Sequence, residues 1–152
     1  MQKETSIDHA LRATWQAVAK MYNEQAAKYN STMATAFVLL NIDYENGTPS
    51  TALGPQMGME PTSLSRILKN MEEDKLIYRE KNPEDGRGVF IKLTDHGKEK
   101  RELSKESVLR FNEIIRQNLT DLELQSFFKV TEKINQLISE RSIFNSVERK
   151  AI

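Results

Sequence analysis

Residues 76–97 read LIYREKNPEDGRGVFIKLTDHG, and this stretch decides the fold. Residues 77–81 and 89–93 are predicted to be strands, because apolar residues alternate with other residues in the second and turn-forming residues separate the two. The intervening residues 82–88 include Pro, Asp and two Gly, which are typical of turns. The stretch therefore predicts a β-hairpin with a protruding tip.

The sequence before the hairpin has helical periodicity. Apolar residues recur at helical spacing over residues 7–22, and this first helix is expected to end near residue 30. A second helix is predicted to end at Asn46-Gly47, because Gly accepts the left-handed conformation found at helix ends. Thr48-Pro49 is expected to open a short third helix, in which Pro55 is awkward because proline removes an intrahelical hydrogen bond.

A fourth helix is predicted to begin at Pro61, only a few residues after the third. Its apolar residues follow the i, i+3, i+4, i+7 spacing of one buried stripe: Leu64, Ile67, Leu68 and Met71. Two helices joined in this way form a helix-turn-helix, whose second helix enters the major groove of DNA. The polar face holds the candidate contacts to bases and phosphates: Thr62, Ser63, Ser65, Arg66, Lys69 and Asn70. Taken alone, this face is more typical of an ordinary solvated helix.

The hairpin favours the DNA-binding interpretation. Arg87 lies between two glycines in the turn, so its side chain projects with little steric cover. A narrow minor groove has an enhanced negative potential that attracts such an arginine. Arg79 and Lys81, on the first strand, add positive charge for phosphates. Double-stranded DNA is therefore the predicted partner.

The helices outside this region predict a homodimer. A helix over residues 95–118 would be about 36 Å long, which is longer than a small domain is wide, so part of its apolar stripe must meet something else. Residues 120–123 form a capping box that starts the last helix. Two-fold pairing with a second chain would cover these helices and present two DNA-reading helices to a pseudo-palindromic site. We expect residues 1–30 and 95–146 to form the dimerisation region, residues 31–94 the winged helix-turn-helix, and residues 147–152 a disordered tail.

The composition excludes several classes of function. The chain has 152 residues with 22 basic and 22 acidic side chains, so it has no uniformly basic surface. It has no Cys, and its two histidines, His9 and His96, are far apart, so we expect neither a metal site nor a cofactor. No catalytic constellation can be named, and no apolar run approaches the length of a membrane span. The sequence predicts a cytoplasmic protein that is not an enzyme.

The hairpin and the residues after it closely resemble the MarR/SlyA family of bacterial winged-helix transcriptional regulators. The resemblance rests on Asp85-Gly86-Arg87, the strand that follows, and Leu93-Thr94-Asp95-His96-Gly97. It implies a mainly α fold with a small β-hairpin wing and long terminal dimerisation helices. It also implies that Arg87 reaches the minor groove, that Asp85 braces the wing through an ion pair with a nearby Arg, and that the dimer acts as a repressor.

The same resemblance implies a small-molecule switch. Members of this family often release DNA when an aromatic or amphipathic acid binds between the dimer helices and the winged helix, and we place Trp15, Tyr22, Met33 and Phe37 near that junction. Most such aromatic side chains belong simply to a protein core. The peroxide-sensing mechanism of the family needs a reactive Cys, which this chain lacks. The alternative is a winged helix that binds another protein and has lost contact with DNA.

Overall fold

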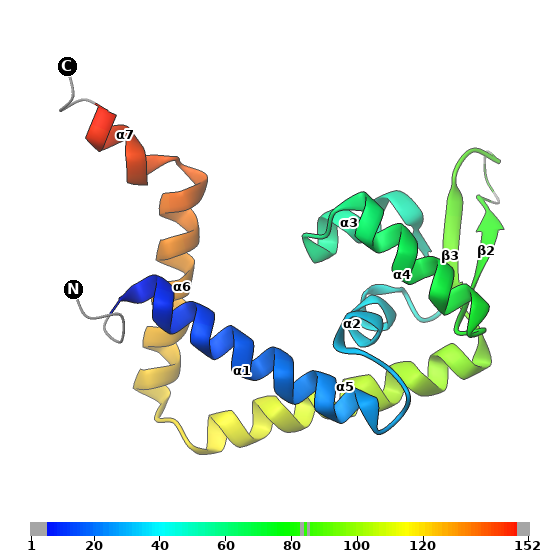
Figure 1. The fold of residues 1–152 in the computed structure, drawn as a ribbon, viewed down its shortest axis with the longest axis horizontal. Coiled ribbons are helices and arrows are strands. Elements are labelled where there is room, and N and C mark those ends of the chain that lie inside the picture. The colour runs from blue at the N-terminus through cyan, green and yellow to red at the C-terminus, as the bar shows by residue number, and fades with distance from the viewer. Residues whose placement is uncertain (1–5, 83, 85, 149–152) are drawn as a thin grey trace. The chain divides into compact units, whose positions relative to one another are not determined.

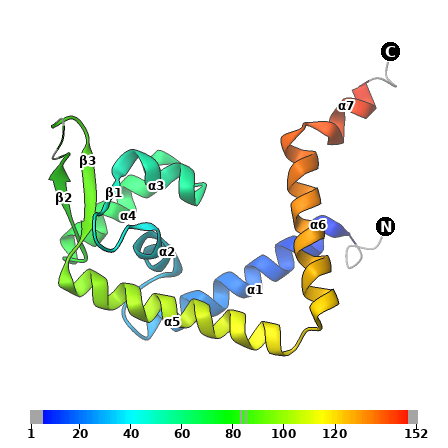
Figure 2. The ribbon, with the colours of Figure 1, turned by 180° about the vertical axis from the view of Figure 1, so that it is seen from behind.

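The computed structural model describes residues 6–82, 84 and 86–148. It groups the chain into two compact units, residues 1–109 and 110–152. The elements in chain order are α1 Ile7–Ala27, α2 Met33–Asn41, β1 Thr48–Pro49, α3 Ser50–Met57, α4 Pro61–Glu73, β2 Ile77–Lys81, β3 Val89–Leu93, α5 Asp95–Gln117, α6 Asp121–Ser139 and α7 Ser142–Glu148 (Figure 1; β1 is labelled in Figure 2). The predicted fold class, a mainly α winged helix-turn-helix, is confirmed.

The core of the winged helix gathers apolar residues from α2, α3, α4 and the sheet. Its buried members are Val38, Leu39, Ile42, Leu53, Leu64, Leu68, Met71, Leu76, Ile77, Ile91 and Leu93. The stripe predicted on α4 faces this core, with Ile67 only partly buried against it. Helix α4 is therefore fixed by one face and presents the other to its surroundings.

The sheet has three strands in the order β1-β3-β2, all antiparallel. The predicted hairpin is correct in extent and pairs Ile77 with Leu93 and Lys81 with Val89. The prediction for Thr48-Pro49 is wrong, because this dipeptide forms the short edge strand β1 beside β3. A proline is tolerated at an edge, where its missing N–H breaks no ladder.

Helix α2 also ends earlier than predicted, at Asn41. The carboxylate of Asp43 accepts hydrogen bonds from the backbone N–H of Glu45 at 3.1 Å and of Asn46 at 2.7 Å. This side chain therefore caps a turn that competes with further helix. Gly47 follows with φ of 74°, and a Cβ there would lie 2.7 Å from the carbonyl oxygen of Ile91, so the chain can reach β3 only with glycine.

A tight joint connects α4, β3 and α5 at the base of the hairpin (Figure 2). The hydroxyl of Thr94 donates to the carbonyl oxygen of Lys75 at 2.6 Å and accepts the N–H of Gly97 at 2.9 Å, so it caps α5. A Cβ on Gly97 would overlap the carbonyl oxygen of Leu76. The Thr94 and Gly97 of the sequence motif therefore have a packing role: they let the first turn of α5 press against the chain after α4.

The second unit contains the end of α5, followed by α6 and α7. The predicted capping box is present, because Thr120 Oγ1 accepts the N–H of Glu123 at 3.2 Å and Glu123 Oε2 accepts the N–H of Thr120 at 2.8 Å. Helix α6, all of which the structure describes, has no buried residue. Its large exposed apolar residues are Leu122, Phe127, Phe128, Val130 and Ile138. Within the described residues, no helix is both long and apolar enough to span a membrane.

Candidate nucleic-acid interface and adjoining cavity

The polar face of α4 is accessible, as a DNA-reading helix requires. Thr62, Ser65, Arg66, Lys69 and Asn70 are exposed. Ser63, also singled out from the sequence, is half-buried. Pro61 at the first helical position starts α4 without losing an intrahelical hydrogen bond. Hydroxyl, amide and cationic groups are thus presented together from one rigid helix.

The wing owes its shape to two glycines and an asparagine. Gly86 and Gly88 have φ of 65° and 88°, in the left-handed region that glycine reaches without strain. Asn82 closes the loop: its carbonyl accepts the N–H of Gly86 at 3.0 Å and its own N–H donates to the carbonyl of Gly88 at 3.1 Å. Arg87 is exposed between the glycines. Asp85, the residue expected to brace the wing, lies outside the described residues.

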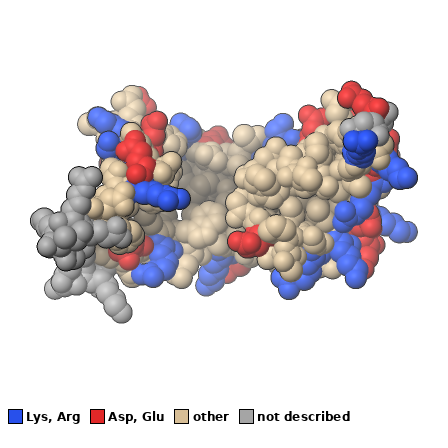
Figure 3. All heavy atoms as spheres, turned by 90° about the horizontal axis from the view of Figure 1, so that it is seen from above, with Lys and Arg blue, Asp and Glu red and all other residues tan. Residues whose placement is uncertain are grey.

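Lys and Arg side chains, blue in Figure 3, lie along the right of that view, with Asp and Glu side chains, red, among them. Part of this charge is paired. Arg79 Nε lies 3.2 Å from Glu72 Oε2 at the end of α4, and Lys92 Nζ lies 3.1 Å from Glu80 Oε2 across the hairpin. Lys81 is exposed at the end of β2. Arg79 therefore links the hairpin to α4, a role that the sequence analysis missed.

The register of the sheet explains this link. Arg79 lies opposite Ile91 and two residues after Ile77, both of which are buried in the core. Side chains at alternate positions of a strand share one face, so Arg79 is on the face that meets α4. The charge pattern alone could not assign this partner, because the choice of Glu72 depends on how α4 packs on β2.

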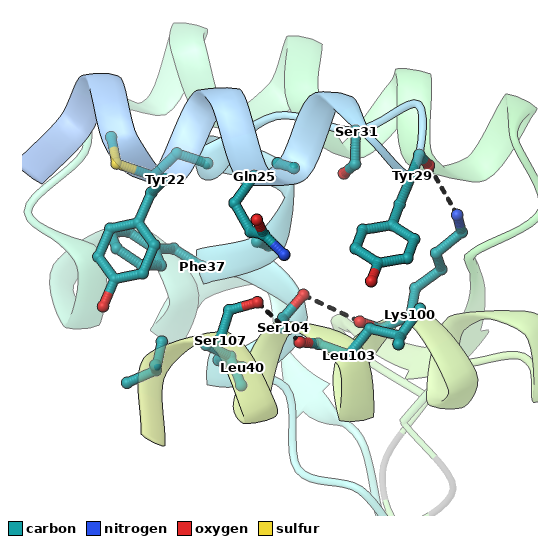
Figure 4. A pocket seen from close by; sticks show the side chains of 14 residues that line it. Tyr22, Gln25, Tyr29, Ser31, Phe37, Leu40, Lys100, Leu103, Ser104 and Ser107 are labelled. Atoms are coloured by element: carbon teal, nitrogen blue, oxygen red, sulfur yellow. Dashed lines mark hydrogen bonds between the residues drawn. The ribbon is translucent and has the colours of Figure 1, made fainter. Parts of the chain in front are cut away.

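A cavity lies between α1, α2 and α5 (Figure 4). Tyr22, Met33 and Phe37, three of the four residues proposed from the sequence, line it. The rings of Tyr22 and Phe37 meet edge to face with centroids 5.7 Å apart, and burial raises the pKa of Tyr22. Trp15, the fourth, is not among the lining residues and is 54% exposed.

The wall formed by α5 was not anticipated. Lys100, Leu103, Ser104 and Ser107 line the cavity at positions i, i+3, i+4 and i+7. Ser104 and Ser107 lie on the face of α5 that turns toward α1 and α2, and their small side chains leave space that larger residues would fill. Two serines at this spacing are the signal in the sequence that could have identified α5 as a wall of the cavity. Their hydroxyls donate to the carbonyl oxygens one turn earlier, at 2.9 Å and 3.1 Å. The cavity therefore has aromatic walls on one side and small polar residues on the other.

Within the part of the chain that the structure describes, no three His, Asp or Glu side chains come together in a group that could hold a metal ion. The candidate interface consists of exposed cations and hydroxyls on α4 and the wing. The cavity is a separate feature, bounded by α1, α2 and α5.

Comparisons with known proteins agree with this geometry. A profile of the MarR family matches residues 32–89. The organic hydroperoxide resistance transcriptional regulator of Bacillus subtilis (strain 168) is 30% identical over 97 residues, which span 64% of this chain and 66% of that protein. The HTH-type transcriptional repressor MdtR of the same organism is 25% identical over 139 residues, which span 89% and 87%.

Among solved structures, CouR from Rhodococcus jostii RHA1 bound to p-coumaroyl-CoA superposes with a TM-score of 0.77 at 18% identity, covering 88% of this chain and 94% of CouR. That likeness shows the shared fold. The matched family and the relatives are transcriptional regulators, so the prediction that the chain is a regulator and not an enzyme is confirmed. The chain belongs to the MarR family of winged-helix transcriptional regulators.

Proposed function

We propose that the chain acts as a homodimeric repressor that reads a pseudo-palindromic DNA site and releases it when a small aromatic or amphipathic molecule binds. The observation that carries the DNA-binding part is the joint exposure of the polar face of α4 and of Arg87, both held by one buried core. A helix and a hairpin fixed in this way can address a major and an adjacent minor groove together.

The proposed DNA contacts fall into two groups, those to base edges and those to phosphates. Thr62, Ser63 and Arg66, in the first turns of α4, read base edges, and the guanidinium suits a guanine. The remaining polar residues of the face bind phosphates, together with Lys81: Ser65, Lys69 and Asn70. Arg79 offers its terminal nitrogens to a phosphate while Nε stays with Glu72.

Dimerisation is supported by apolar surface that the single chain leaves uncovered. Helix α1, described along its whole length, has no buried residue, and Ile7 on it is 69% exposed. Phe127 and Phe128 on α6 stack edge to face and are both more than half exposed. Burial of such residues against a second copy removes apolar area from water, and a two-fold axis repeats the same contact. Repression as the sign of regulation is supported by the name of one relative, the repressor MdtR.

An effector site is supported by the cavity and by one structural relative. CouR was solved with p-coumaroyl-CoA, which carries an aromatic ring. The rings of Tyr22 and Phe37 supply an apolar, aromatic surface of the kind that binds such a ring. The chain contains no Cys, so a response through thiol oxidation is closed to it.

The decisive experiment is a DNA-binding titration. Double-stranded sites selected by the protein from a random pool are titrated at several salt concentrations, and fluorescence anisotropy reports the Kd. We expect salt-sensitive binding that weakens about tenfold or more in Arg87→Ala and in Arg66→Ala, because each removes a groove contact. Lys133→Ala, on the exposed surface of α6, is the control with the same loss of charge.

The alternative function, a winged helix that binds only another protein, makes the opposite prediction. It requires that no site be enriched from the pool and that binding to DNA lack salt dependence. It also requires that Arg87→Ala leave any residual DNA affinity unchanged. The exposed basic wing and polar α4 favour DNA.

A further inference from the structure

Lys100 is placed unusually in the cavity. Of the described residues that line the cavity, Lys100 alone carries a charge. Its Nζ donates to the carbonyl oxygen of Tyr29 at 2.7 Å and lies 5.8 Å from the centre of the Tyr29 ring, as Figure 4 shows. Within the described part of the chain no carboxylate lies within 4.0 Å of this ammonium group. Lys100 is thus a half-buried cation in a cavity whose other described lining residues are neutral.

The partner of Lys100 belongs to the turn between α1 and α2. Helix α1 ends at Ala27, and the chain then turns through Asn30, whose φ is 55°. The carbonyl of Tyr29 lies in this turn, two residues after the last residue of α1. Lys100 therefore ties the turn between α1 and α2 to α5. A carboxylate would be a stronger partner for an ammonium group than a carbonyl oxygen.

The cavity is too small, as it stands, for the ligand that its walls suit. It holds about 40 Å³. An engineered cavity that binds benzene measures roughly 150 Å³. Side chains must therefore move when an aromatic ring enters. Tyr29 and Lys100 are the side chains expected to move, because Tyr29 is 38% exposed, Lys100 is only half-buried, and an anion can replace the hydrogen bond between them.

We propose that Lys100 is the specificity-determining residue of the effector site: it binds the carboxylate of a small aromatic acid and in doing so leaves the carbonyl of Tyr29. The inference rests on the proposed effector response and names the residue of that site that selects an acid over a neutral molecule. The ring of the acid lies among Tyr22 and Phe37. Ser104 and Ser107 lie beside the carboxylate on the same face of α5 as Lys100.

The exchange of partners couples the cavity to the DNA-binding surface. Before the acid binds, Lys100 ties the turn between α1 and α2 to α5. Helix α2 belongs to the core of the winged helix through Val38 and Leu39, and α5 starts at the base of the wing. When Lys100 turns to the acid, this tie is lost and the ring enlarges the cavity between the same three helices. Ligand and DNA thereby favour different arrangements of one set of helices.

The test separates recognition of the ligand's negative charge from recognition of its shape. Benzoate, phenylacetate and cinnamate are each compared with the corresponding neutral amide, which has nearly the same shape, by calorimetric titration of the full chain without DNA. We expect at least one acid to bind about tenfold or more tightly than its amide, as a charge-assisted hydrogen bond implies. Lys100→Met should abolish this preference, so that acid and amide bind with the same affinity, whereas Lys100→Arg should keep it.

Lys105→Met is the matched control, because Lys105 is exposed on the same helix and does not line the cavity. It should bind the acid like the unaltered chain. Equal binding of acids and amides, no binding of any acid, or a preference that survives in Lys100→Met would each overturn the proposal. In a parallel anisotropy titration, the acid that binds should weaken DNA binding by the unaltered chain and not by Lys100→Met. Failure of DNA binding in the absence of any ligand would contradict the proposed function instead, so the two are distinguishable.

Discussion

The winged helix and helix α6 differ in where their apolar side chains go. In the winged helix, residues such as Ile91 and Leu53 are completely buried, and the polar residues of α4 face outward. In α6, which carries a similar supply of large apolar residues, none is buried. Large apolar side chains are thus buried in the winged helix and exposed on α6.

The winged helix buries its apolar side chains within one chain, whereas α6 does not. Burial of the winged-helix residues stabilises that region within one chain at roughly 25 cal/mol per Å² of apolar area. The exposed residues of α6 contribute little of this until a second surface covers them. We infer that the winged helix folds within one chain. The exposed apolar residues of α6 are covered only when a second copy pairs with it.

The largest loss of stability is expected at Gly97, where α5 meets the chain after α4. Gly97→Ala places a Cβ on the carbonyl oxygen of Leu76, and backbone atoms on both sides cannot yield cheaply. We expect the free energy of unfolding to fall by roughly 4 kcal/mol, as for severe overpacking in a core. Urea denaturation followed by circular dichroism measures this loss. Gly58→Ala is the control: its φ is 62° with open space around it, so only the left-handed strain of about 1 kcal/mol applies.

The next largest effect separates core from surface directly. Ile91→Ala removes a fully buried side chain of the central strand and should cost about 3 kcal/mol, because a cavity is left behind. Val130→Ala on α6, where the residue is 56% exposed, should change the unfolding of the monomeric state by less than about 0.5 kcal/mol. Equal losses in the two variants would show that α6 is buried within its own chain.

The third prediction concerns the uncovered face of α6. Phe127→Asp adds a charge to the proposed dimer surface and should weaken dimerisation by about 2 kcal/mol, or roughly thirtyfold. Sedimentation over a range of concentrations measures the shift. Gln125→Asp adds the same charge at another exposed position of the helix and serves as the control. A chain that is monomeric before any substitution would contradict the dimer outright.

The smallest effect is expected at the link between α4 and the hairpin. Glu72→Gln removes the carboxylate that holds Arg79, in a pair whose side chains are 44% and 40% exposed. Such a pair contributes less than about 1 kcal/mol to stability, so the unfolding midpoint should move little. The salt dependence of DNA binding is the sharper measurement. Loss of the negative charge should strengthen binding slightly, and a weaker complex would show that Glu72 is needed to position Arg79.

Local patterns were enough to predict the hairpin, α4 and its outward face. Each of these depends on residues close in sequence: the alternation of residues 89–93, the turn formers before them, and the stripe from Leu64 to Met71. The family resemblance added the expectation of an effector site, and Tyr22 and Phe37 do line a cavity. The DNA-binding role of α4 and the hairpin stays a prediction, and so does the ligand-binding role of Tyr22 and Phe37.

The features that the sequence did not reveal all depend on distant partners. Thr48-Pro49 is a strand only because β3 lies beside it, and nothing in the dipeptide itself excludes the start of a helix. The link from Arg79 to Glu72 requires the packing of α4 on β2. Lys100 meets Tyr29 across a separation of 71 residues. No periodicity within one helix could have joined these pairs.

The joint at Gly97 also has a mechanical consequence. The first turn of α5 touches the chain after α4 so closely that no side chain separates them, and β3 runs from the same point toward the tip of the wing. A strand of this length is a rigid arm of about 17 Å at about 3.4 Å per residue. A swing of α5 by about 10° that carries this arm with it would displace the tip by about 3 Å, which is the length of one hydrogen bond. Small rotations of a long helix are thereby amplified into the gain or loss of a groove contact.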